Sequence, residues 1–177
     1  DFVFAKAKYS RALDMRPVKL NTRGYCLLKQ GRHPLLGAGA VPLDFYIGES
    51  NRALLITGPN TGGKTVALKT VGLLTLMAQA GLHVPVEAGS EIAVFEDILA
   101  DIGDGQSMEQ SLSTFSAHVL NILTMLNCAD SRTLVLLDEL GAGTDPAEGR
   151  GFAIAVLEEI FARGATIVAT THFGEIK

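Results

Sequence analysis

The residues from Gly58 to Thr65 read GPNTGGKT, a spacing of glycines, lysine and hydroxyl that is typical of a phosphate-binding loop. The apolar run Ala53–Thr57 precedes them, and an Ala/Leu-rich helical pattern follows. A strand that turns into a helix N-terminus directs backbone N–H groups and the positive end of the helix dipole toward one point. Lys64 can then reach the β- and γ-phosphates of a nucleotide, and the Thr65 hydroxyl can hold Mg²⁺. The predicted nucleotide contacts come from this loop and the residue after it: Gly58, Pro59, Asn60, Thr61, Gly62, Gly63, Lys64, Thr65 and Val66.

A second chemically active group is the pair Asp138 and Glu139, which ends the apolar run Thr133–Leu137. Such a run is typical of a parallel strand covered on both faces. Ligands of open parallel sheets bind beyond the carboxyl ends of the strands, so we expect both carboxylates to face the phosphate-binding loop. Asp138 is predicted to hold Mg²⁺ beside Thr65, and Glu139 to accept a proton from the water that attacks the γ-phosphate. This pair favours hydrolysis over transfer to a second substrate.

His172 follows another apolar stretch, Ala165–Thr170, and is the third candidate for chemistry. An imidazole at the end of a neighbouring strand can hydrogen-bond the γ-phosphate or the attacking water. The predicted catalytic residues are therefore Glu139, His172 and Lys64. The remaining histidines have no comparable placement and are interpreted as structural or surface residues: His33, His83 and His118. The role of His33 is left open because it lies in the loop that enters the nucleotide domain.

Two loops carry hydroxyl groups and glycines whose chemistry a single subunit does not explain. Gln110–Ser116 opens a predicted helix with hydroxyl groups at its start, and Gly141–Asp145 follows the acidic pair. Hydroxyls and free N–H groups at a helix start are good phosphate ligands. They are also ordinary helix caps, and from the residues alone capping is the preferred interpretation.

These groups need strands and helices to position them, and the apolar periodicity predicts both. We expect helices at residues 1–15, 64–80, 113–126 and 146–163. We expect strands at residues 25–29, 53–57, 133–138 and 165–170, with one or two short strands within 92–102. Strand–helix–strand units of this kind predict an α/β fold with a largely parallel sheet and right-handed crossovers.

Composition narrows the class of protein. The chain has 177 residues, of which 47% are hydrophobic, and no apolar run approaches the ~18 residues of a membrane span. It also lacks the zones of a secretion signal, which predicts a cytoplasmic protein without membrane contact. Cys26 and Cys128 are interpreted as buried small hydrophobes. Residues 1–32 carry a net charge of +6 and the remainder −10; the basic segment is a candidate for polyanion binding outside the nucleotide site, although a solvated helix face is the stronger interpretation.

The segments GPNTGGKT, SLSTFSAH, LVLLDELGAGTDPAEG and ATTHF, in this order, resemble the ATPase domain of the MutS family, within the ABC-type ATPase superfamily. The form DELGAGTDP-x-EG together with SLSTFS resembles the MutS-two branch, whose members usually end in an Smr nuclease-type domain. The resemblance implies an α/β P-loop NTPase fold with a mixed, largely parallel sheet flanked by helices. It assigns residues 23–177 to an ATPase domain truncated at its C-terminus, and residues 1–22 to the end of a preceding helical core or lever.

In that family two subunits form a head-to-tail composite site. The resemblance therefore implies a homodimer in which Ser113 approaches the γ-phosphate bound by the partner's Lys64, with Gly141–Asp145 lining the same interface. It also implies that Asn60 orients phosphate or water, and that ATP and Mg²⁺ are the ligands. The family's C-terminal dimerisation segment and Smr domain lie outside this chain.

The function implied by the resemblance is a Mg²⁺-dependent ATPase whose cycle opens and closes a dimer and so drives a nucleic-acid clamp. One implied target is branched or recombining DNA, which would mean suppression of homologous recombination. The other is the rRNA of stalled and collided ribosomes, which would mean ribosome rescue. Both contacts and the endonuclease activity are assigned to domains absent from this chain. The alternatives are a non-hydrolysing nucleotide switch for dimerisation or a mismatch-repair MutS. A transporter-type ABC domain and a GTPase are disfavoured, because the sequence has no LSGGQ-like run and no N-K-x-D motif.

Overall fold

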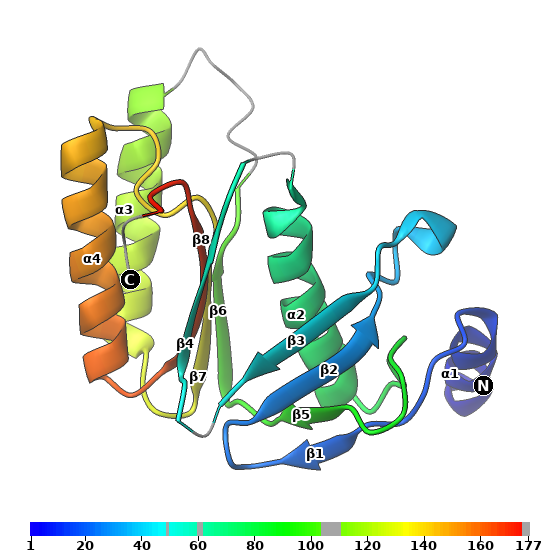
Figure 1. Cartoon of the computed structure of the whole chain (residues 1–177). Helices are drawn as coiled ribbons and strands as arrows, with labels where there is room; N and C mark the ends of the chain where they lie inside the picture. Colours follow the sequence, from blue (N-terminus) through cyan, green and yellow to red (C-terminus); the bar gives the residue numbers. More distant parts are fainter. Residues whose placement is uncertain (49, 60–61, 104–110, 175–177) are drawn as a thin grey trace. The chain divides into compact units, whose positions relative to one another are not determined.

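The computed structural model of the chain describes residues 1–48, 50–59, 62–103 and 111–174. They form two compact units, whose elements are labelled in Figure 1. One unit comprises Asp1–Asn51 with Lys69–Val94, and the other comprises Arg52–Leu68 with Phe95–Lys177. The boundary falls inside helix α2 (Lys64–Gln79), whose first turn belongs to the second unit.

The first unit is built on a four-stranded sheet in the order β1-β5-β2-β3. Its strands are β1 (Lys19–Asn21), β2 (Cys26–Gly31), β3 (Leu43–Ile47) and β5 (Glu91–Ala93). β1 and β5 are parallel, whereas β2 runs antiparallel to β3 and β5. Cys26 and Leu28 of β2 and Phe45 and Ile47 of β3 are buried, an alternation expected for an antiparallel pair with one covered face. The alternation in β2 ends at the register shift between Leu28 and Gly31. The unit also contains α1 (Phe2–Ala12), which buries none of its residues, and the short 3₁₀ helix η1 (Gly37–Gly39).

The second unit has a four-stranded sheet in which every pairing is parallel. In spatial order its strands are β4 (Ala53–Thr57), β8 (Thr166–Thr171), β7 (Thr133–Leu137) and β6 (Asp97–Asp101). All five residues of β7 and all six of β8 are buried. This burial suits the apolar run of β7, whereas β8 also carries three threonines, Thr166, Thr170 and Thr171.

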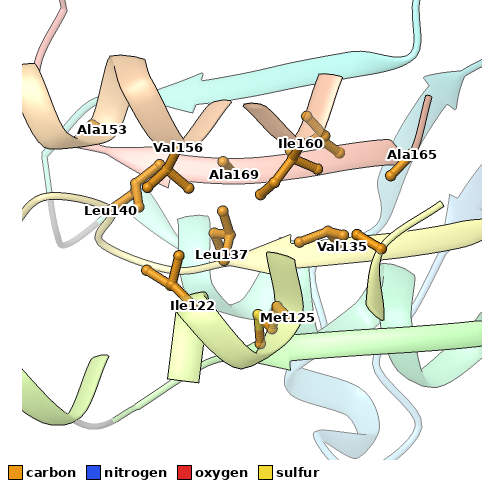
Figure 2. Close-up of a cluster of buried hydrophobic side chains, with 12 residues drawn as sticks. Ile122, Met125, Val135, Leu137, Leu140, Ala153, Val156, Ile160, Ala165 and Ala169 are labelled. Carbon is orange, nitrogen blue, oxygen red and sulfur yellow. The ribbon is translucent and has the colours of Figure 1, made fainter. Parts of the chain in front are cut away.

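Helices α3 (Ser111–Cys128) and α4 (Pro146–Ala162) cover one face of this second sheet (Figure 1). Figure 2 shows side chains of both helices meeting those of β7 and β8 in one apolar cluster. The cluster consists of Ile122, Met125, Ala129, Val135, Leu137, Leu140, Ala153, Val156, Ile160, Ala165, Ile167 and Ala169. Burial of this surface holds the two helices on the sheet, because removal of apolar area from water is the main favourable contribution to packing.

The limits of α4 follow from local chemistry. The Asp145 carboxylate caps the helix by accepting hydrogen bonds from the backbone N–H groups of Ala147 and Glu148. Pro146 occupies the first helical position, where its missing N–H is not needed. Gly164 follows the C-cap with a φ of 87°, a left-handed conformation that glycine adopts without steric cost and that ends the helix.

The predicted elements of the site are confirmed, with ends that differ by a few residues, and the α/β class is confirmed. Two strands, β1 and β3, were not predicted, because β1 has three residues and β3 follows Pro42 with charged Asp44 inside it. The structure also differs from the prediction of one mixed, largely parallel sheet: one sheet is mixed and a separate one is wholly parallel.

The two cysteines lie in different environments. Cys26 is buried as predicted, and desolvation by this burial raises the pKa of its thiol to about 11, although the Ala93 N–H donates to its sulfur. The prediction for Cys128 is wrong: it ends α3 and is exposed. Among the described residues, none of the helices combines the length and the apolar character needed to cross a bilayer.

Ile160→Ala is expected to destabilise the fold by about 2–5 kcal/mol, because Ile160 is fully buried in the cluster and its truncation leaves a cavity. Ile154, on the same helix, is 38% exposed and provides the matched control. Ile154→Ala is expected to cost less than about 1 kcal/mol. Urea unfolding of both variants measures the difference, and equal losses would contradict this account of the core.

Candidate functional site

The parallel sheet of the second unit brings the predicted site segments to a single edge. Strand registers pair Thr57 with Thr171, Leu137 with Ala169, and Asp101 with Leu137. All four strands therefore end at the same side of the sheet. The GPNTGGKT loop, the acidic pair and His172 each follow directly after one of these strand ends, which confirms the expected alignment of the segments.

The glycine-rich loop leaves open space above its backbone. Gly58 and Gly63 have φ values of 143° and 74°, which L-residues rarely adopt. A Cβ atom built at Gly58, Gly62 or Gly63 meets no heavy atom within 4 Å. Asn60 and Thr61 lie outside the described residues. The main chain at these three glycines, here called the glycine cradle, is thus open to the close approach of a ligand, as a phosphate-binding loop requires.

Lys64 is held over this cradle. Its side chain is 6% exposed, and its Nζ donates to the carbonyl oxygens of Gly58 at 2.5 Å and Pro59 at 2.9 Å. Lys64 is also the first residue of α2, so Thr65 and Val66 follow in the first helical turn. The ammonium group, the N-terminal turn of a 16-residue helix and the open glycines suit a triphosphate.

Asp138 is fixed from both sides at the end of β7. It is 6% exposed, and one of its carboxylate oxygens accepts a hydrogen bond from the Thr170 hydroxyl of β8. Its backbone N–H donates to the Asp101 carbonyl at 2.9 Å, which continues the pairing with β6. The other carboxylate oxygen is not engaged by this bond. Mg²⁺ commonly takes one or two protein oxygens together with substrate phosphates, so a carboxylate held in this way has the chemistry of a Mg²⁺ ligand. Its predicted pairing with Thr65 stays a prediction.

Glu139 adopts a left-handed backbone conformation with a φ of 49°. This conformation costs a non-glycine residue about 1–2 kcal/mol. It is held by two hydrogen bonds to β8: the Glu139 N–H donates to the Thr170 hydroxyl at 2.8 Å, and the Leu140 N–H donates to the Thr170 carbonyl at 2.9 Å. The kink turns the chain sharply at the residue after Asp138, so the two carboxylates can serve different tasks. Strain of this kind is common at functional sites.

His172 lies next to Glu139. The distance from its Nε2 to the nearer carboxylate oxygen of Glu139 is 3.7 Å, and both side chains are partly exposed. His172 also lines a pocket of about 430 Å³ with Pro146, Ala147, Arg150, Phe173 and Gly174. The structure therefore brings two of the three predicted catalytic residues together, and both are more exposed than Asp138.

The role of Thr170 was not predicted from the sequence. Its hydroxyl bonds the Asp138 side chain and the Glu139 backbone, and the next hydroxyl, that of Thr171, donates to the Leu140 carbonyl at 3.1 Å. The available signal in the sequence was a pair of threonines at the end of a predicted strand. It identified no bonding partner, because the strand that lies next to β8 is set by the strand order of the sheet.

The loop Gly141–Asp145 packs tightly on α4. A Cβ at Gly141 would lie 2.3 Å from the Gly149 carbonyl oxygen, and a Cβ at Gly149 would lie 2.2 Å from that of Gly141. Both positions therefore need glycine. This close approach fixes the loop that follows the acidic pair, and its predicted place at an interface between subunits stays a prediction.

Ser113 is the third residue of α3, because the helix begins at Ser111. The capping interpretation of the hydroxyl groups in Gln110–Ser116 stays a prediction, because Gln110, which precedes Ser111, lies outside the described residues. The Ser113 side chain lies outside the described residues. Its predicted contact with a second subunit stays a prediction.

Comparisons with known proteins agree with this arrangement. Residues 54–177 match the family described as MutS domain V. Aligned over 100% of its length, the chain is 60% identical to an endonuclease MutS2 of Halalkalibacterium halodurans and 60% identical to one of Geobacillus kaustophilus. An endonuclease MutS2 of Caldanaerobacter subterraneus is 55% identical over the same full span. The chain covers 23%, 23% and 22% of these relatives. The chain therefore belongs to the MutS family through its domain V, and along its whole length it is similar to proteins named endonuclease MutS2.

Proposed function

We propose that this chain is the Mg²⁺-dependent ATPase domain of a MutS2-like protein. The observation that supports this most strongly is the parallel sheet edge, which carries the open glycine cradle with Lys64 and the differently oriented Asp138 and Glu139. A phosphate cradle alone binds nucleotide. Hydrolysis also requires a fixed carboxylate that holds a metal ion and a second carboxylate near solvent that accepts a proton.

Each side chain has a separate role in this proposal. Lys64 and the loop N–H groups bind the β- and γ-phosphates. Thr65 and Asp138 would hold Mg²⁺, which would supply positive charge to neutralise the developing phosphate charge. Glu139 orients a water molecule and takes its proton as the water oxygen bonds to the γ-phosphorus. The bond to the β–γ bridging oxygen breaks, and ADP and phosphate are released. His172, adjacent to Glu139, hydrogen-bonds the γ-phosphate or the water.

The complete site in this proposal contains two copies of the chain. Ser113 at the start of α3 reaches the γ-phosphate bound to the second subunit, so ATP binding closes the homodimer and hydrolysis opens it. In the full-length protein this cycle drives a cytoplasmic clamp on branched DNA or on ribosomes. The relatives are named endonucleases, which supports a nuclease activity in the regions beyond this chain.

Lys64→Ala is expected to weaken ATP binding by about 10–100-fold, because a charged hydrogen-bond donor contributes about 1.5–3 kcal/mol. Turnover should fall to background. Lys69→Ala, an exposed lysine later on the same helix, is the matched control and should bind as the parent does. Binding of a fluorescent ATP analogue measures the change, and undiminished affinity of Lys64→Ala would contradict the nucleotide site.

Glu139→Gln is expected to lower ATP turnover in the full-length protein about 100-fold or more, because amide replaces the general base. ATP affinity should be retained, since Glu139 is not assigned to binding. Glu158→Gln, at an exposed position of α4, is the control and should leave turnover unchanged. Phosphate release is measured alongside ATP binding.

Unchanged turnover in Glu139→Gln would overturn the role of Glu139. Nucleotide-dependent dimerisation with no phosphate release in the parent protein would instead favour the alternative of a non-hydrolysing switch.

A further inference from the structure

Asp101, the last residue of β6, has a carboxylate that is bonded at both oxygens to α3. One oxygen lies 2.7 Å from His118 Nδ1, and the other accepts a hydrogen bond of 2.8 Å from Asn121 Nδ2. Asp101 is 8% exposed, whereas the His118 side chain is 30% exposed and Asn121 is exposed. The carboxylate is thus buried at the strand end and held by two polar groups that reach it from the helix.

The same residue is bonded through its backbone to the acidic pair. The Asp101 carbonyl accepts the hydrogen bond from the Asp138 N–H at 2.9 Å, and Asp101 pairs with Leu137 in the sheet register. One residue therefore links the strand end that presents Asp138 to helix α3. Asp101 bonds Asp138 through its main chain and bonds α3 through its side chain. Substitution of the side chains on α3 can therefore remove the second link and leave the first in place.

His118 and Asn121 are three residues apart and so share one face of α3. Ser113 is five residues before His118, which places about 7.5 Å of helix between them. The imidazole also packs on the chain that leaves β6, since a Cβ at Gly103 would lie 3.2 Å from its Cε1. Phe115, also near this helix start, makes an edge-to-face ring contact with Phe152 of α4. Through His118 and Asn121, Asp101 therefore contributes to the position of the helix start relative to β6.

We propose that Asp101, His118 and Asn121 form a positioning triad that fixes the serine-bearing start of α3 for the nucleotide of the second subunit. This inference rests on the proposed function, because it assigns the triad an effect on turnover that passes through Ser113. Hydrogen bonds of defined direction suit this task, since errors of about 1 Å in the position of a group at a reacting centre cost roughly 100-fold in rate. His118 and Asn121 are positioning residues and not catalytic ones.

The first test compares His118→Ala with His118→Asn in the full-length protein. An asparagine amide nitrogen occupies nearly the place of the imidazole Nδ1 and can donate to the carboxylate. His118→Ala is expected to lower kcat about tenfold with ATP affinity unchanged, and His118→Asn to restore at least half of the parent kcat. Asn121→Ala should act as His118→Ala does, whereas Asn127→Ala, at an exposed position of the same helix, should have no effect.

The second test asks whether the triad acts through Ser113. If it does, the double variant Ser113→Ala/His118→Ala turns over ATP within about twofold of Ser113→Ala alone, because residues that act as one unit are not additive. Thermal unfolding is recorded for every variant, and the exposed Asn121 supplies the comparison if His118→Ala unfolds below the assay temperature.

Three outcomes would each overturn the proposal. The first is a parent-like kcat in both His118→Ala and Asn121→Ala, and the second is a loss of kcat in His118→Asn equal to that in His118→Ala. The third is a fully multiplicative loss of kcat in the double variant. These outcomes leave the proposed function intact as long as the parent protein hydrolyses ATP and Lys64→Ala does not. Absence of hydrolysis in the parent protein would overturn the proposed function itself.

Discussion

The arrangement of this molecule depends on the position of β8 between β4 and β7. Because β8 pairs in parallel with both neighbours, it carries the alignment of strand ends from the glycine-rich loop to the acidic pair. The full burial of β8 makes this pairing costly to disturb. The strand order therefore brings three parts that are distant in the sequence to one edge of the sheet: the glycine-rich loop, the carboxylate pair and His172.

At that edge, the hydroxyl of Thr170 sets the difference between two neighbouring carboxylates. It donates to the Asp138 side chain and accepts from the Glu139 N–H, so Asp138 stays buried against the sheet while Glu139 turns through a left-handed conformation toward His172. Adjacent residues of one strand would otherwise point to opposite faces. A threonine one strand away thus gives the two carboxylates different positions, as the proposed roles of Asp138 and Glu139 need. Asp101 likewise positions a neighbouring segment through hydrogen bonds, because its carboxylate bonds two side chains of α3.

The sequence predicts most of the second unit, because its elements have strong periodicity and its motifs lie at element ends. Gly58 to Thr65 predicts strand, loop and helix together, and Asp138 with Glu139 predicts the end of a buried strand. Thr170 and Asp101 could not be found in this way, because their partners are set by strand order and by the packing of α3, which are properties of the whole sheet. Strand β1 escaped prediction because its three residues carry little apolar signal, and β3 because it follows Pro42 and contains the charged Asp44. The exposure of Cys128 depends on which face of α3 meets the sheet.

In the proposed function, Ser113 of a second copy completes the nucleotide site. The most direct measurement mixes subunits carrying Lys64→Ala with subunits carrying Ser113→Ala and records ATP turnover. In a mixed dimer, the intact loop of one subunit meets the intact serine of the other, so one of the two sites is complete. When equal amounts of the two variants form two-fold symmetric dimers at random, half of the dimers are mixed, and the expected turnover is about a quarter of the parent's. Turnover of the mixture that does not exceed the sum of the two variants measured separately would contradict it.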